Sequence, residues 1–345
     1  MPTLESWCPR GLRQAATTLL LLTLAACGDS PTVTAPPPVN PSPGVNVTGA
    51  VVDGVSNQPV AGATILIGGL GQATSAPDGS FGLRTTESPA TRAVTITSPS
   101  TIDRATWAFV SGTVMTLPLM PSSLGLTAFD QMFRGSGGAL HRWTTAPRIV
   151  IQRRVLQFTN VTDTAYVATA SVMSDADVEA LLADLTWALP QLTGSTFSAF
   201  ADPQVEMAAE NDRVAVSRTG IVVVARYQGL TSASTFWGYT RWAWNGAGEM
   251  QAGIVMLDQG FETSGSPFRR SLRAHELGHA LGYNHVTATA SVMSSAARTE
   301  PNDFDRGGSR IAFLRPVLNR SPDADPAPSA IPAGGPGTLV WSESP

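Results

Sequence analysis

The feature that most constrains this chain is a cluster of histidines in its last quarter. The sequence of 345 residues holds four His, and three of them, His275, His279 and His285, fall within eleven residues. His275 and His279 are four residues apart, so on a helix their side chains lie on one face, one turn apart. The stretch therefore predicts a helix that carries two imidazoles on the same face.

A glycine between the second and third histidines predicts where this helix ends. Gly282 lies three residues after His279, and glycine can take the left-handed conformation that ends a helix and turns the chain back. Such a turn can bring His285 to the other two imidazoles. Three protein ligands with one open position are what catalytic zinc needs, whereas structural zinc sites close with four. We therefore predict one catalytic Zn²⁺ as the cofactor.

The remaining residues of the stretch point to a hydrolytic zinc site. Glu276 follows His275 and points about 100° away around the helix, so it can approach a water on the metal without being a ligand. Residues 275–285 (HELGHALGYNH) resemble the pattern H-E-x-x-H-x-x-G-x-x-H of the metzincin zinc peptidases, and residues 291–294 (SVMS) resemble their Met-turn.

The resemblance to metzincins implies a fold, an activity and a set of roles. It implies a zinc endopeptidase that hydrolyses peptide bonds of a protein or peptide substrate, with Glu276 as general base and Met293 beneath the zinc. It also implies that an extended substrate adds to the strand before the helix, for which residues 253–258 (GIVMLD) are the candidate. The implied zinc ligands are His275, His279 and His285.

Other interpretations of the cluster stay open at this point. The three histidines could be ordinary core or surface residues, or the chain could be a non-enzymatic lipoprotein that uses a degenerate protease fold and a β-sandwich to bind glycan or protein. A zinc hydrolase acting on something other than a peptide would share the same water-activating residues.

Residues near the cluster receive structural roles. We expect Ser271 to cap the start of the helix, Arg273 to face solvent or a partner, and Tyr283 to pack on the helix end. Asp305 is expected to cap a final short helix. The fourth histidine, His141, stands alone after a glycine-rich stretch and is left out of the site.

The N-terminus has the pattern of an export signal. Arg10 and Arg13 precede a short apolar run, residues 17–24, that is too short to span a bilayer as a mature helix. The Leu-Ala-Ala-Cys sequence at 24–27 resembles a bacterial lipobox, which implies cleavage of residues 1–26 and a membrane anchor of lipid on Cys27. An ordinary cleaved signal or a retained anchor helix is the alternative. Gly28 favours the outer membrane or cell surface over the inner membrane.

Composition divides the rest of the chain. Residues 27–44 are rich in Pro, Ser and Thr and predict an extended tether, and the Pro-rich residues 316–345 predict a disordered tail. Residues 45–120 show short strands with turn signals, resemble the carboxypeptidase regulatory-like β-sandwich and show no cluster of His, Cys or carboxylates. Residues 122–315 mix strand and helix patterns. We therefore expect an α+β, metzincin-like catalytic domain with a mixed twisted sheet, preceded by a small all-β sandwich domain.

Charge and cysteine content limit the partners. The formal net charge is −4 and no Lys/Arg run stands out, so nucleic acid is a poor candidate partner. Of the two cysteines, Cys8 lies in the segment expected to be removed. A single remaining cysteine cannot form an internal disulfide, and a zinc site of cysteines is excluded.

Overall fold

A computed structural model describes residues 45–330 and 340–343, apart from positions 113, 136, 235 and 297. The expected signal peptide 1–26, the expected lipidation site Cys27 and the expected tether 27–44 lie outside the described residues. Within the described part of the chain, no helix is long and apolar enough to cross a membrane.

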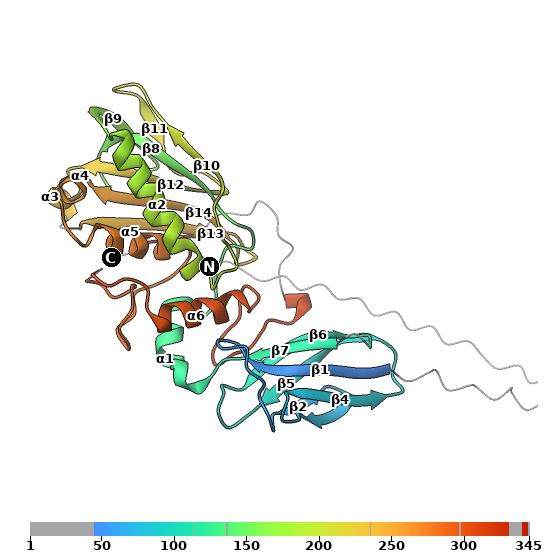
Figure 1. Cartoon of the computed structure of the whole chain (residues 1–345). Coiled ribbons are helices and arrows are strands. Elements are labelled where there is room, and N and C mark those ends of the chain that lie inside the picture. Colours follow the sequence, from blue (N-terminus) through green and yellow to red (C-terminus); the bar gives the residue numbers. More distant parts are fainter. Residues whose placement is uncertain are drawn as a thin grey trace, which may run out of the picture. The chain divides into compact units, whose positions relative to one another are not determined.

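The N-terminal third of the described chain consists of strands in two sheets (Figure 1). One has the order β4-β1-β7 and the other the order β3-β2-β5-β6. Apolar side chains alternate along these strands and meet in a core of their own, which includes Val47, Ile65 and Ile96. The strands are β1 (Val45–Asp53), β2 (Thr64–Ile67), β3 (Gly71–Thr74), β4 (Ser80–Thr85), β5 (Ala90–Thr97), β6 (Arg104–Val110) and β7 (Val114–Leu119).

The rest of the strands form one mixed sheet with the order β11-β9-β8-β12-β14-β13-β15, and β10 also pairs with β8. The neighbours β8, β12 and β14 are parallel, whereas β13 runs antiparallel to β14. The strands are β8 (Arg148–Gln157), β9 (Ala165–Val172), β10 (Ala201–Glu206), β11 (Arg213–Ala215), β12 (Ile221–Gln228), β13 (Gly238–Trp244), β14 (Met250–Asp258) and β15 (Val340–Glu343).

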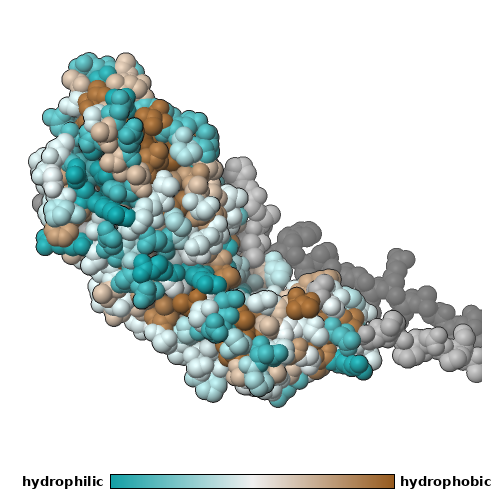
Figure 2. Space-filling view, viewed as in Figure 1, coloured by the Kyte–Doolittle hydropathy of each residue, from teal (hydrophilic) through white to brown (hydrophobic). Residues whose placement is uncertain are grey.

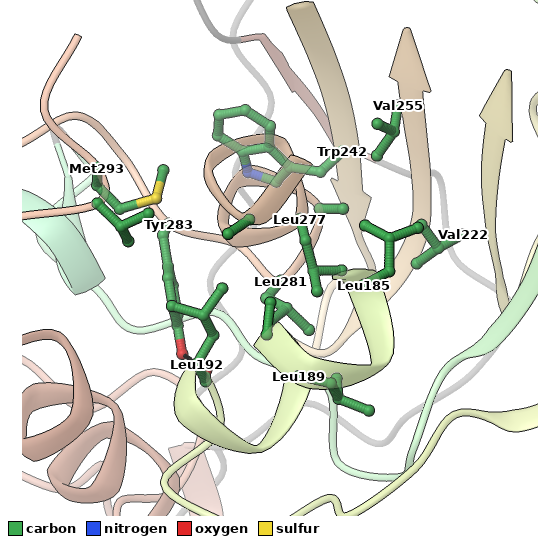
Figure 3. Packing of buried hydrophobic residues seen from close by; sticks show 14 of the residues in the cluster. Leu185, Leu189, Leu192, Val222, Trp242, Val255, Leu277, Leu281, Tyr283 and Met293 are labelled. Carbon is green, nitrogen blue, oxygen red and sulfur yellow. Dashed lines mark hydrogen bonds between the residues drawn. The ribbon is translucent and has the colours of Figure 1, made fainter. Parts of the chain in front are cut away.

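Six α-helices accompany this sheet in the described residues, and two of them matter for the site. Ser174 caps α2 by accepting a hydrogen bond from the backbone N–H of Asp177. Leu185 and Leu189 of α2 pack with Leu277 of α5 and with Leu281, which directly follows α5. These leucines lie in one core with strand residues such as Val222 and Val255 (Figure 3). The helices are α1 (Leu126–Phe129), α2 (Asp175–Gln191), α3 (Leu230–Ser234), α4 (Gln259–Thr263), α5 (Arg269–Ala280) and α6 (Asp303–Phe313).

Strands dominate this architecture, and the expected fold class is wrong. Strand accounts for 37% of the structure and helix for 23%, spread over several sheets. The α+β description underestimates the strands because β3, β6, β9, β10 and β11 are short or polar on one side, and their sequences carry weak alternation. The chain is better described as a mainly β structure in which a few helices cover one large mixed sheet.

The expected disordered tail is also wrong in its first part. Arg315 and Asp323 form a fully buried ion pair with Nη2–Oδ2 at 2.6 Å. Asp325 accepts hydrogen bonds from Arg104 and Thr106 of β6. The Pro-rich composition suggested disorder, yet these buried carboxylates hold residues 316–325 against the folded chain.

Candidate metal centre

The helix α5 that carries the first two histidines is buried from Ser271 to its end. All residues from Ser271 to Ala280 are buried, and Leu272 and Leu277 pack into the main core. The helix begins at Arg269 after Phe268, so Ser271 lies inside it and does not cap it as expected. A helix surrounded on all sides by protein holds its side chains in fixed positions, which a metal site requires.

Gly282 ends α5 as the sequence predicts. Its φ is +104°, and a Cβ at this position would lie 2.8 Å from the carbonyl oxygen of His141, so only glycine fits. The N–H of Tyr283 donates to Gly278 O and the N–H of Gly282 donates to His279 O. This pair of bonds is the Schellman arrangement, and it turns the chain towards His285.

The turn brings the three imidazoles together. The Nε2 atoms of His275 and His279 are 3.1 Å apart, and each lies 3.2 Å from Nε2 of His285. A tetrahedral zinc ion with Zn–N bonds of about 2.0–2.1 Å separates its nitrogen ligands by about 3.3–3.4 Å. The three nitrogens therefore fit a single zinc ion. Among the described residues, no Cys, Asp or Glu joins this group, which leaves a coordination position for water or substrate.

Two of the histidines are oriented by backbone carbonyls. Nδ1 of His275 lies 2.7 Å from Val292 O, and Nδ1 of His279 lies 2.7 Å from Tyr283 O. Each Nδ1–H donates to its carbonyl, so each Nε2 presents a lone pair to the metal position. Burial lowers the pKa of His275 to about 4, lowers that of His279 well below its usual value, and also lowers that of His285. Each of these shifts favours the neutral ring, which is the form that binds a metal ion.

The loop expected to form the Met-turn contacts α5 at His275 and Gly278. Met293 is fully buried, and a Cβ on Gly278 would lie 2.3 Å from its Sδ, so the absence of a side chain on α5 makes room for the methionine. Asp305 holds this loop from α6, because its carboxylate accepts hydrogen bonds from Ser291 Oγ and from the N–H of Val292. The same carboxylate completes a capping box at the start of α6, in which Asn302 is the N-cap and Asp305, expected to be the cap, is the third helical residue.

Glu276 points towards β13. Its Oε2 accepts a hydrogen bond of 2.6 Å from the hydroxyl of Thr240, and a Cβ on Gly238 would lie 2.4 Å from its Oε1. Burial raises the pKa of this carboxyl group to about 8, while the Thr240 hydroxyl lowers it. A divalent cation beside the group would favour the charged form. Glu276 is thus a buried, oriented carboxyl group suited to proton transfer.

The buried arginine of α5 corrects another expectation. Arg273 does not face solvent: it is 3% exposed and donates to Glu262 of α4 and to Asp184 of α2. Arg226 of β12 also contacts Glu262, with Nη2–Oε2 at 3.2 Å. This group of charges ties α5 to two helices and the sheet, two residues before His275.

Several residues of the site could not be found from the sequence. Thr240 orients Glu276, and the ring of Trp242, two residues further along β13, stacks on His279 with centroids 5.3 Å apart. The sequence shows that Thr240 and Trp242 lie on the same face of a predicted strand, but it does not show which helix packs against that strand. His141 stays outside the site, as expected: it stacks on Trp244 and its Nδ1 lies 3.2 Å from Gly248 O.

Comparison with known proteins covers little of this chain. No family model matches, and no curated protein matches. A DUF3823 family protein from Bacteroides ovatus matches 23% of this chain and 45% of its own, at 16% identity and a TM-score of 0.20. A DUF3823 family protein from Parabacteroides merdae matches 23% of this chain and 47% of its own, at 13% identity and a TM-score of 0.20. A chain of a type II cohesin–X-dockerin complex from Acetivibrio cellulolyticus matches 21% of this chain and 51% of its own, at 24% identity and a TM-score of 0.17.

The expected assignment of this chain to the metzincins is wrong. Two of the three structures are DUF3823 family proteins, and none of the three is a metzincin peptidase. The motif was misleading because it describes one helix and one turn, and such a local constellation does not define a family. The chain spans about half the length of the structures it matches, so their low similarity says nothing about its activity. The chemistry has to be argued from the site alone.

Proposed function

We propose that this chain is a zinc-dependent endopeptidase. The observation that carries the proposal is the geometry of the three Nε2 atoms, which lie 3.1–3.2 Å from one another. Glu276 lies on the helix that carries His275 and His279. The residues suited to hold the ion are His275, His279 and His285. Bound there, zinc supplies Lewis-acid chemistry, which polarises a carbonyl group and makes water a nucleophile near neutral pH.

Residues around the proposed metal position transfer the proton and hold the reacting groups in place. Glu276 accepts the proton of the attacking water and later passes it to the leaving amine. Thr240 holds one carboxylate oxygen of Glu276, and Gly238 leaves room for the other. The backbone carbonyls of Val292 and Tyr283 keep two imidazoles in the tautomer that binds metal. His285 is only partly buried, so the site is open to solvent on its side.

The site also has a proposed place in the cell. A lipid on Cys27 would anchor the protein to the outer membrane or cell surface, since multiply acylated N-termini bind membranes stably. Residues 27–44 would then separate the enzyme from the membrane, and its substrates would be proteins or peptides outside the cytoplasm.

A metal and activity assay on the same variants tests the proposal. Wild-type protein should contain one zinc ion per chain by elemental mass spectrometry and cleave casein or a dye-quenched peptide library. Glu276→Gln should keep the zinc and lose about 10²–10⁴-fold in rate. His285→Ala should lose most of the zinc. His141→Ala is the matched control, because this histidine lies outside the site and the variant should keep both metal and activity.

The possible failures have different meanings. Glu276→Gln cleaving at the wild-type rate would refute the general base. A zinc-bound wild-type protein that cleaves no peptide would favour the non-enzymatic lipoprotein. Mass spectrometry of the products separates peptide hydrolysis from a zinc hydrolase that attacks another bond.

A further inference from the structure

The outer edge of β13 runs along the candidate metal site. Thr240 of this strand donates to Glu276, Trp242 stacks on His279, and Gly238 lies against the Glu276 carboxyl group. The strand lies beside α5 in the fold (Figure 1). A chain that pairs with the outer edge of β13 therefore lies beside the three histidines.

The strand expected to bind substrate has no such edge. Residues 253–258 belong to β14, which pairs with β12 on one side and with β13 on the other. A strand with two neighbours offers no unpaired backbone groups to a peptide. The sequence pointed to β14 because it directly precedes α4 and α5, whereas sheet order places β13 at the outside.

The chain's own last residues already pair with β13. The strand β15 (Val340–Glu343) lies antiparallel to it, with Val340 opposite Trp244 and Glu343 opposite Arg241. The direction of β15 thus leads from Trp244 towards the part of β13 that contacts Glu276. Antiparallel pairing uses backbone groups, so this edge accepts an extended segment largely regardless of sequence.

The length of β15 makes it displaceable. It has four residues, and pairs with one strand only in the described part of the chain. Short edge strands contribute few hydrogen bonds, and local opening at a sheet edge costs much less than global unfolding. Residues 331–339 join it in sequence to the described residues before it, and nine residues of any chain span at most about 30 Å.

On the side drawn in Figure 2, hydrophobic residues form small groups among polar ones. Docking through backbone pairing at a sheet edge does not need an apolar groove.

We propose that the outer edge of β13 is the docking edge for an extended peptide, and that residues 340–343 occupy it as an intramolecular competitor of substrate. The segment binds antiparallel to β13 and leads towards the site as the substrate would. This inference rests on the proposed peptidase function for its competitive role, but the pairing itself is measured without activity.

The test uses full-length variants and one truncation. Of two consecutive residues in an edge strand, one directs its backbone N–H towards the neighbouring strand and the other directs it towards solvent. Proline has no backbone N–H, so Trp341→Pro/Ser342→Pro removes a hydrogen-bond donor to β13 whichever of the two residues supplies it. A chain ending at residue 339 removes β15 altogether. The matched control is Ala333→Pro/Gly334→Pro, which adds two prolines to the connecting residues and keeps β15. Zinc content and the thermal midpoint verify that each variant is folded.

Two readouts decide the proposal. Hydrogen exchange of the fragment that covers residues 238–244 should accelerate in the truncated and Trp341→Pro/Ser342→Pro chains and not in the control. If β15 fills the edge in nine of ten molecules, loss of β15 should lower the apparent KM for a dye-quenched peptide about tenfold, with kcat unchanged. A synthetic hexapeptide VWSESP, the sequence of residues 340–345, should restore both values in the truncated chain.

Each contrary outcome has its own reading. Unchanged exchange in β13 after truncation overturns the pairing. Faster exchange with an unchanged KM overturns the competition. If no variant hydrolyses peptides, the proposed function fails, and exchange alone decides the docking edge: protection restored by the hexapeptide supports it, and absence of protection overturns it. If protection of residues 238–244 from hydrogen exchange depends on protein concentration, β15 of a second copy pairs with β13. That result overturns the proposal of an intramolecular competitor.

Discussion

Replacement of Asp305 by alanine tests how the site depends on residues that touch no metal. Asp305 accepts three hydrogen bonds, from Ser291 Oγ, from the N–H of Val292 at 3.0 Å and from the N–H of Asn302 at 2.9 Å. The first two donors belong to buried residues, 1% and 0% exposed. A buried donor left without a partner costs about 1–3 kcal/mol, so Asp305→Ala should lower the free energy of unfolding by about 2–6 kcal/mol.

The same substitution should also weaken zinc binding. The carbonyl of Val292 accepts from Nδ1 of His275 at 2.7 Å, and Asp305 fixes the N–H of that same residue. Loss of a partner that orients a metal-bound histidine lowers metal affinity about 10–100-fold. Competition with a fluorescent chelator measures this, and urea unfolding with chelator present measures the stability of the metal-free chain separately.

A matched control lies two residues away on the same helix. Asp303 is fully exposed at the start of α6 and pairs only with the exposed Arg306 in the described structure. Asp303→Ala should therefore change stability and zinc affinity little. If Asp305→Ala loses no more stability than Asp303→Ala and binds zinc with equal affinity, the loop is not held by Asp305 and the reasoning fails.

Three further predictions concern the surroundings of α5. Glu262→Ala removes the buried carboxylate that Arg226 and Arg273 share, although Asp177 and Asp184 remain as partners, and should cost about 3–5 kcal/mol by urea unfolding. Glu206→Ala, which breaks a surface pair with Arg218, should cost about 0–1 kcal/mol, and equal losses would contradict the role of burial. Gly278→Ala places a Cβ 2.3 Å from Sδ of Met293 and should weaken zinc binding; an unchanged zinc affinity would show that the methionine moves freely. Chelation should lower the thermal midpoint of wild type but not of His285→Ala, because only bound ligand stabilises; an equal shift would place the metal elsewhere.

The sequence predicted the local parts of this site well. The four-residue spacing of His275 and His279, the helix end at Gly282 and the position of His285 are all properties of one continuous segment. Their geometry follows from the period of the helix and the conformational freedom of glycine. The helix α2 with its Ser174 cap was predictable for the same reason.

The non-local parts were not predictable. Thr240 and Trp242 reach the site because β13 lies beside α5, and sheet order cannot be read from strand patterns. The buried position of Arg273 depends on Glu262 and Asp184, which come from two other helices. A positive charge near a helix start normally indicates solvent exposure, and only tertiary pairing reverses that expectation. Family membership was the least local inference, and it failed.

The surroundings of α5 give an independent physical reason for a cation at this site. Burying a polar helix is costly unless each polar group has a partner. Arg273 has Glu262 and Asp184, Glu276 has Thr240, and the Nδ1 atoms of His275 and His279 have backbone carbonyls. The Nε2 atoms of the three histidines instead face one another at 3.1–3.2 Å. Because their Nδ1–H groups are donating, two of these nitrogens present lone pairs, which repel at this distance. Partners for these neighbouring polar groups, together with lone pairs that converge on one point, are the arrangement that the proposed metal site requires.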